Sequence, residues 1–285
     1  MKIRDLMLRF PHLPEQIFQK LDNESLFKCR EVQRSWQNII DGRNYPWLRI
    51  VNIPTILKER NSYLHLAAET GQIEAFKTAL NQEEDKNIKN VHGETSLYFA
   101  CKKGHFKIVQ LLLKNVDLKI DFNAKESELG ITAFHLACFC GHLDVVKILV
   151  DNAATLNIDL NATSFNNYTG FNLACQKGYT NVVKIFIENA ANLSIDLNRK
   201  NKHGLTGFHL ACLKGYTYVV NIFLENAANL SIDLNRKDKD GHTAFILAYI
   251  RGHSDVVKIL KKNAAALRID IQKCKCKGCK IRHNK

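Results

Sequence analysis

Apolar residues along most of this chain fall into pairs of short clusters, separated by polar segments that contain glycine. Thr206 precedes one such pair and can cap a helix through its hydroxyl, and Gly215 between the two clusters can end a helix. The pattern predicts two short helices followed by a polar turn. The clusters of this pair are Phe208, Leu210, Ala211 and Cys212, then Val219, Val220, Ile222, Phe223 and Leu224.

The same pattern recurs every 37 residues. The segment ENAANLSIDLNRK occurs twice, at 188–200 and at 225–237. An earlier unit is shorter, because Gly71 precedes Gly104 by 33 residues. Neither helix of a unit can bury its apolar face alone, so neighbouring units must stack as a solenoid. The glycines that mark the period are Gly104, Gly141, Gly178, Gly215 and Gly252.

The repeated motif G-x-T-x-F-H-L-A-C-x-x-G-[HY] resembles the core of the ankyrin repeat. The resemblance covers residues 57–274 as six units and implies an all-α solenoid of helix pairs with short hairpin connections. Asn167 stands where the hairpin of the fourth unit needs a positive φ, which asparagine tolerates next best after glycine. The proline of the family motif is replaced at five helix starts, by Ser96, Ala133, Gly170, Gly207 and Ala244.

Units two to six are four residues longer than an ordinary ankyrin repeat, and the extra residues follow the second helix. Ala190 and Ala227 stand where the family has a helix-ending glycine. Four residues make about one helical turn. We therefore expect a second helix that is one turn longer in units two to six, and the shorter form in the first unit.

Residues 1–50 carry a different pattern, which is followed by a linker at 51–56. Between residues 10 and 41 the apolar positions predict a helix, a polar turn at 22–25 and a helix of about 15 residues. The run from Leu13-Pro14 to Trp36 resembles an F-box, although Leu13-Pro14 lies about one turn too close to Ile17.

The F-box resemblance implies docking on the SKP-family adaptor of a cullin–RING ubiquitin ligase. The rest of the chain would then present a protein substrate. The alternative is that the same side chains only hold the two helices together. The residues that the family pattern assigns to docking are Pro14, Ile17, Leu21, Leu26, Val32 and Trp36.

The ankyrin resemblance places target-binding positions at the hairpin tips and on the inner side of the first helices. Exposed positions are normally polar, but several here are aromatic, aliphatic or cationic, which predicts a protein-binding groove. The alternative is that neighbouring hairpins pack together and hide these side chains. The predicted groove residues are Leu129, Ile131, Phe139, Phe165, Tyr168, Lys177, Leu205, Leu213, Lys214, Ile250 and Arg251.

Four of the nine cysteines follow the motif alanine, a position that holds a small buried residue. His135 and His209 lie three residues before Cys138 and Cys212, a spacing that also suggests a catalytic thiol. The resemblance instead implies that these histidines bond the backbone between units. No phosphate loop, G-x-S-x-G or H-E-x-x-H motif is present. We expect no enzymatic activity and no cofactor.

The formal net charge is +13, and the end of the chain concentrates it. Residues 275–285 form a basic, cysteine-rich tail that can solubilise the chain or contact nucleic acid, of which we favour the first. Gly278 lies 37 residues after Gly241, which indicates the start of a seventh hairpin rather than a zinc site. The zinc-type ligands, whose spacing matches no common finger, are Cys274, Cys276, Cys279 and His283.

No apolar run approaches the roughly 20 residues of a membrane-spanning helix. The first residues are too charged for a signal peptide, so we expect a soluble protein of the cytoplasm or nucleus. The favoured interpretation is a substrate-recognition subunit of a cullin–RING ligase. Open alternatives are an ankyrin scaffold or inhibitor, a nucleic-acid-associated protein and a Cys/His hydrolase.

Overall fold

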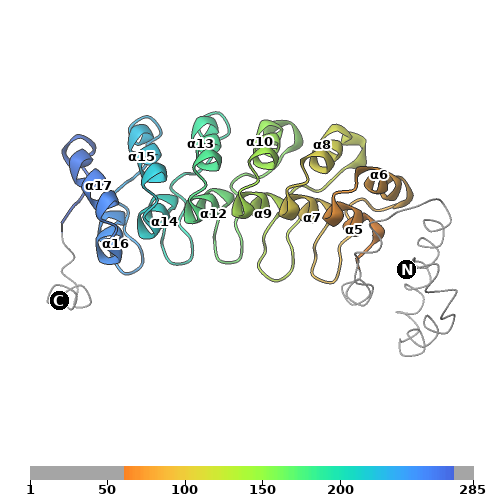
Figure 1. The fold of residues 1–285 in the computed structure, drawn as a ribbon, viewed down its shortest axis with the longest axis horizontal. Helices are drawn as coiled ribbons and strands as arrows, with labels where there is room; N and C mark the ends of the chain where they lie inside the picture. The colour runs from red at the N-terminus through yellow and green to blue at the C-terminus, as the bar shows by residue number, and fades with distance from the viewer. Residues whose placement is uncertain (1–60, 273–285) are drawn as a thin grey trace, which may run out of the picture.

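The computed structural model describes residues 61–272, which form two rows of antiparallel helices (Figure 1). Among these residues there is no β-strand, so the predicted all-α ankyrin-type solenoid is confirmed. The F-box-like module at 1–50, the linker at 51–56 and the tail at 275–285 lie outside the described residues. The inner helices are α5 (Tyr63–Thr70), α7 (Ser96–Lys103), α9 (Ala133–Cys140), α12 (Gly170–Lys177), α14 (Gly207–Lys214) and α16 (Ala244–Arg251). The outer helices are α6 (Ile73–Gln82), α8 (Phe106–Lys114), α10 (Leu143–Asp151), α13 (Thr180–Asn189), α15 (Thr217–Asn226) and α17 (Ser254–Leu267).

The inner helices begin and end as their sequence predicts. In units two to six, the threonine before the helix accepts a hydrogen bond from the backbone N–H three residues later, as Thr206 does from His209. Each inner helix ends at a glycine in the left-handed region. These caps fix the helix length at eight residues in every unit.

One apolar core runs between the two rows through all six described units. Phenylalanine rings from inner and outer helices alternate along its centre, with successive ring centroids 5.3–5.7 Å apart. These rings link units three, four and five, so each of these units stabilises its neighbours, as a solenoid requires. In order, these rings belong to Phe134, Phe186, Phe171, Phe223 and Phe208.

The predicted longer second helix occurs only in unit six. There α17 runs unbroken for 14 residues, whereas α13 and α15 have 10 residues, as does α6 of the shorter first unit. The extra residues of units two and three form short separate helices, η2 (Val116–Leu118) and α11 (Ala153–Leu156). Those of units four and five form turns. The prediction was therefore wrong for units two to five.

Helix propensity gives a reason for this difference. The segment that ends α17 contains Ala264, Ala265 and Ala266, which are all strong helix formers. At the position of Ala266, units four and five have Asn192 and Asn229, which favour turns over helix interiors. Alanine at this position therefore allows the outer helix to continue through the extra turn, whereas asparagine favours a separate turn.

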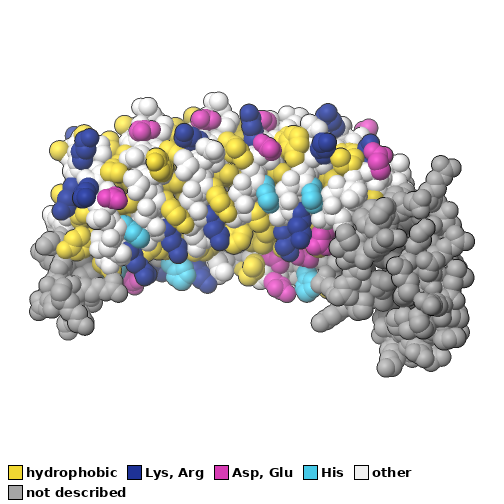
Figure 2. Space-filling view, in the orientation of Figure 1, with side chains coloured by type: hydrophobic (Ala, Val, Ile, Leu, Met, Phe, Trp, Pro, Cys, Tyr) yellow, Lys and Arg dark blue, Asp and Glu magenta, His cyan; other side chains and the backbone are white. Residues whose placement is uncertain are grey.

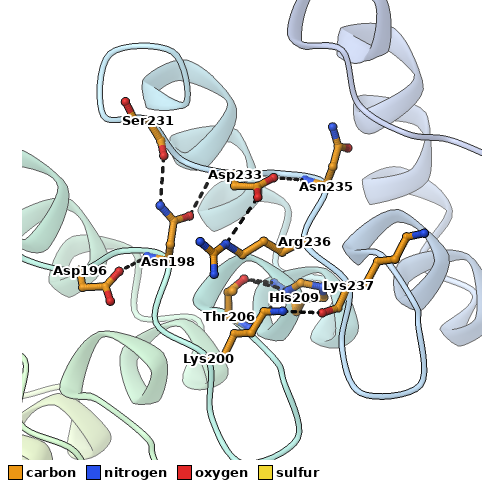
Figure 3. Close-up of polar contacts among 10 residues, drawn as sticks. All are labelled: Asp196, Asn198, Lys200, Thr206, His209, Ser231, Asp233, Asn235, Arg236 and Lys237. Atoms are coloured by element: carbon orange, nitrogen blue, oxygen red, sulfur yellow. Dashed lines mark hydrogen bonds and ion pairs between the residues drawn. The ribbon is translucent and has the colours of Figure 1, made fainter.

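A repeated Asp-x-Asn motif after the outer helices ties neighbouring units together (Figure 3). Asp196 accepts a hydrogen bond from the backbone N–H of Asn198 at 3.0 Å. The Asn198 amide then donates to the Ser231 carbonyl of the next unit and accepts from the Asp233 N–H. The residue that supplies the carbonyl has a positive φ, for example 50° at Ser231. The bridging asparagines are Asn87, Asn123, Asn161, Asn198 and Asn235.

The hairpins are joined to one another by their backbones. The Phe165 N–H donates to the Leu129 carbonyl at 2.8 Å, and the Lys202 N–H donates to the Asn166 carbonyl at 2.9 Å. Asn167 has a φ of 57°, which confirms the conformation predicted for the fourth hairpin. The hairpins extend below the inner helices in Figure 1, and backbone hydrogen bonds of this kind join each to the next.

Candidate protein-binding surface

The predicted groove residues at the hairpins divide into exposed and half-buried side chains. Leu129 is 51% exposed and Phe165 is 65% exposed. Ile131, Tyr168 and Leu205 are half-buried and pack against the core. These three side chains are therefore partly hidden by the core. Among the predicted groove residues at the hairpins, Leu129 and Phe165 offer the larger apolar surface, and Val91 of the second hairpin, which was not predicted, is 46% exposed.

Phe165 is held in place by the hairpin of the preceding unit. Its backbone bonds Leu129, and its ring lies so close to Gly130 that a Cβ there would meet ring carbons at 2.6 Å. Gly130 also has a φ of 66°. Phe165 is thus an ordered, exposed aromatic side chain, which is the kind of side chain that anchors protein interfaces.

The last two residues of the inner helices form the second part of the predicted surface. Because the helices are equivalent and stack side by side, their last residues form one row and their penultimate residues form an adjoining row. We call the cations in the last position the cation row and the apolar residues in the penultimate position the apolar row. The cation row is Lys103, Lys177, Lys214 and Arg251, and the apolar row is Phe139, Leu213 and Ile250.

Aromatic and cationic side chains meet where the two rows adjoin. The Lys177 ammonium lies over the Phe139 ring, 4.1 Å from its centroid, so α9 and α12 share this contact. Phe139 remains 40% exposed. A cation over an aromatic face contributes about 0.5–1 kcal/mol at an exposed site. The contact orients Lys177 while its remaining donors stay accessible.

Most of the cation row has no acidic partner within the part of the chain that the structure describes. Lys103 pairs with Glu69 at 3.3 Å, but Lys177, Lys214 and Arg251 form no ion pair among residues 61–272. All four cations are exposed. Figure 2 shows Lys and Arg side chains interspersed with hydrophobic ones along the solenoid. This surface therefore combines exposed positive charge with exposed and half-buried apolar side chains.

Sequence reasoning missed two members of this surface, Lys103 and Cys140. Lys103 lies two units before Lys177, so the repeat numbering alone could have placed it in the same row. Cys140 occupies the intervening position and is half-buried. Burial raises the pKa of its thiol, while nearby Lys102 and Lys177 act in the opposite direction.

The motif cysteines belong to the core, as predicted. Cys101, Cys138, Cys175 and Cys212 are each 0% exposed, and burial raises the pKa of every one of these thiols. A thiol with a raised pKa is a poor nucleophile at neutral pH. The geometry therefore gives no support to a hydrolase that uses these cysteines.

The motif histidines join neighbouring units. His135 receives the Thr132 N–H at Nδ1, and its Nε2 lies 3.0 Å from the Tyr168 carbonyl of the next unit. His65 makes the same pair of contacts with Ser62 and Glu94. His209 keeps the capping contact, but its Nε2 has no hydrogen-bond partner among the described residues.

Burial lowers the pKa of these buried histidines, to about 4 at His65. The rings are therefore neutral at pH 7. They act in helix capping and in the contact between units, and neither role requires a catalytic partner.

One group of possible metal ligands lies at the sixth hairpin. Ligand atoms of Asp238, Asp240 and His242 lie within 4.8 Å of one another. However, one oxygen of Asp238 already accepts hydrogen bonds from the backbone N–H groups of Asp240 and His242. Asn201 bonds the fifth hairpin in the same way, so the acid has a structural role that accounts for its position.

Two sets of predicted site residues are outside the described part of the chain. They are the F-box-type positions Pro14, Ile17, Leu21, Leu26, Val32 and Trp36, and the zinc-type ligands Cys274, Cys276, Cys279 and His283. Within residues 61–272, no helix has the length and apolar character needed to cross a membrane.

Comparison with known families agrees with the architecture. The family "Ankyrin repeats (3 copies)" matches residues 64–163, and "Ankyrin repeats (many copies)" matches residues 189–248. Together the two matches span more than half of the 285 residues. The chain belongs to the ankyrin-repeat proteins, a class whose repeats indicate a role in protein–protein interaction.

Similar stretches occur in much longer proteins. The chain is 42% identical over 53 residues to a rice protein named "Probable E3 ubiquitin-protein ligase XBOS33" and 43% identical over 53 residues to Arabidopsis "E3 ubiquitin-protein ligase XBAT33". It is 36% identical over 91 residues to the human "Transient receptor potential cation channel subfamily A member 1". These stretches cover 19%, 19% and 31% of this chain, but only 10%, 10% and 8% of the respective relatives.

Proposed function

We propose that this chain is a protein-interaction adaptor that presents a target protein to a ubiquitin ligase. The observation that carries the binding role is the exposed surface of the inner helices and hairpins. Phe139, Phe165 and Leu129 supply apolar anchors there, beside Lys177 and Lys214, which form no ion pair within residues 61–272. A solenoid offers such a surface along its whole length, which suits a protein segment better than a small molecule.

Two observations support the ligase part of the proposal. The pattern from Leu13-Pro14 to Trp36 resembles an F-box, which implies docking on an SKP-family adaptor. In addition, rice and Arabidopsis relatives of the repeat region are named as E3 ubiquitin ligases. Their similarity covers about a tenth of each relative, so it supports a role in ubiquitin ligation but not a shared mechanism.

The mechanism we propose is tethering. The repeats hold the target, residues 1–50 hold the adaptor, and the chain thereby raises the effective concentration of the target near the transfer machinery. Short flexible connections give effective concentrations on the order of millimolar. The proposal includes no catalysis and no cofactor in this chain, and it places the protein in the cytoplasm or nucleus.

Capture of the purified SKP-family adaptor by the full chain tests the proposal. We expect the wild-type chain to retain the adaptor and the Leu26→Ala/Trp36→Ala double variant to lose it. Circular dichroism of both chains shows whether the helical repeats remain folded. Absence of capture by a folded wild-type chain would remove the ligase role.

A scaffold or inhibitor without a ligase role is the second candidate. The match to a cation channel favours it, because that relative carries similar repeats without being named a ligase. The adaptor capture experiment separates the two candidates, since a scaffold needs no SKP-family partner.

A further inference from the structure

We propose that the cation row and the apolar row bind an extended acidic protein segment that has a carboxylate at every third residue. The inference rests on the proposed protein-binding function and specifies the chemistry of its target. Lys177, Lys214 and Arg251 form the charged part of this site, and Phe139 forms its apolar end.

Charge complementarity identifies the sign of the partner. Lys177, Lys214 and Arg251 end three consecutive inner helices, are exposed, and form no ion pair among residues 61–272. The contact between the first two units shows what such a cation attracts, because Glu69 of unit one pairs with Lys103 of unit two at 3.3 Å. Carboxylates from a partner would occupy the three remaining positions.

Repeat geometry identifies the spacing of the charges. Packed helices lie about 8–10 Å apart, which sets the distance between successive cations. An extended polyproline-type segment rises about 3.1 Å per residue and completes a turn in three residues. Side chains at every third position therefore lie on one face, about 9 Å apart. A segment of the form Glu-x-x-Glu-x-x-Glu matches the three cations in register.

The apolar row favours a peptide over a nucleic acid. Leu213 and Ile250 lie beside the cations and are half-buried, so a partner must cover aliphatic surface as well as charge. Phosphate backbones gain little from such contacts. The Phe139 ring already carries the Lys177 ammonium on its face, which competes with base stacking there.

Helix electrostatics offers a different reason for these cations. A positive side chain at the end of a helix interacts favourably with the C-terminal carbonyl groups. If that were the whole role, replacing the cations would lower thermal stability without affecting any ligand. The test must therefore measure stability and binding on the same variants.

Fluorescence anisotropy of labelled peptides with the full chain provides the test. One peptide carries three glutamates at every third position, and a permuted peptide of the same composition carries them consecutively. We expect the first peptide to bind about tenfold more tightly than the permuted one. The Lys177→Ala/Lys214→Ala/Arg251→Ala variant should bind the first peptide about tenfold more weakly than the wild-type chain does. The single Lys214→Glu variant should weaken it as well. Added salt should weaken the wild-type complex.

The matched control is Lys147→Ala/Lys184→Ala/Lys262→Ala, which removes three exposed cations from the outer helices. It changes the net charge equally and should leave peptide binding unchanged. Equal affinity for both peptides, equal loss in both triple variants, or loss of thermal stability without loss of binding would overturn the inference. Tighter binding of oligothymidylate through the same three residues would overturn it in favour of a nucleic acid.

Adaptor capture distinguishes this inference from the function on which it rests. The Lys177→Ala/Lys214→Ala/Arg251→Ala chain should still retain the SKP-family adaptor, because the proposed docking residues lie in 1–50. Adaptor capture without peptide preference would refute only the acidic-segment inference. Peptide preference without adaptor capture would refute only the ligase role.

Discussion

At the residue scale, the glycine that ends each of the first five inner helices is required for two independent reasons. Gly178 has a φ of 76°, which L side chains rarely adopt. A Cβ at Gly178 would also lie 2.8 Å from ring atoms of Tyr216 in the next unit. In the same way, a Cβ at Gly71, Gly104 or Gly215 would meet the ring of a histidine from the following unit, which is His105, His142 and His253 respectively. The Gly-[His/Tyr] part of the motif is therefore a contact between units as well as a helix end.

Gly178→Ala should be more destabilising than Gly252→Ala. Both substitutions place alanine in the left-handed region, which costs about 1–2 kcal/mol. Only Gly178 faces a neighbouring ring, whereas nothing lies within 4 Å of a Cβ at Gly252. Displacing Tyr216 should add about 1 kcal/mol or more. Urea unfolding measures the difference, and equal losses of stability would contradict the contact.

The buried histidines make stability depend on pH. Burial lowers the pKa of His65 from 6.5 to about 4, so the unfolded chain binds more protons than the folded chain between these values. The contribution of His65 is complete above pH 6.5 and is lost as the pH falls towards 4.

His65→Asn should reduce the loss of stability between pH 6.5 and 4. Asn172 shows that asparagine fits this position, because its amide accepts from the Thr169 N–H and donates to the Arg199 carbonyl. We expect stability at pH 7 to change by less than about 1 kcal/mol. The free energy of unfolding measured across this range gives the slope for each chain. A slope identical to that of the wild type would contradict a buried neutral histidine.

At the element scale, the turn after each outer helix connects the units. The Asp-x-Asn motif lies largely on the surface, and its hydrogen bonds cross from one unit to the next. Its two-residue spacing is typical of a local turn, in which an acid accepts the N–H two residues later. The partner of the asparagine lies 33 residues away, so the sequence shows the motif but not the bridge.

Asn198→Ala should lower the free energy of unfolding by about 1–3 kcal/mol, because it removes two hydrogen bonds worth about 0.5–1.5 kcal/mol each. Gln272→Ala is the matched control, since Gln272 occupies the same position after the last described unit and is exposed. It should change stability by less than about 0.5 kcal/mol. Chemical denaturation distinguishes the two. A loss from Asn198→Ala no larger than that from Gln272→Ala would show that the bridge contributes little.

At the scale of the whole molecule, the sequence predicts those features of the solenoid whose residues recur in every repeat. Threonine caps, glycine ends and buried cysteines follow from local chemistry and the 37-residue period. The longer second helix was not predictable from repeat length alone. The four extra residues continue the helix in unit six, which has Ala266, but form a separate turn in unit five, which has Asn229 at the same position. Exposure of the groove residues was only partly predictable, because it depends on how neighbouring hairpins pack.

The final described unit differs from the internal ones where a following unit would pack. Cys212 is fully buried beneath unit six, whereas Tyr249 takes the equivalent position in unit six and is 39% exposed. Leu224 on α15 is buried, but its equivalent on α17 is the exposed Lys261. A seventh unit of the internal type would meet a bulky ring and a charge. These two residues therefore suit the end of a solenoid, where a polar outer face is needed.

For the molecule as a whole, we propose that one chain couples an adaptor to a target through two separate surfaces. Isothermal titration of the purified SKP-family adaptor into the full chain tests it most directly. We expect one adaptor to bind per chain, the Lys177→Ala/Lys214→Ala/Arg251→Ala variant to bind with unchanged affinity, and the folded Leu26→Ala/Trp36→Ala variant not to bind. No binding to the folded wild-type chain would contradict the claim and leave an ankyrin-repeat scaffold.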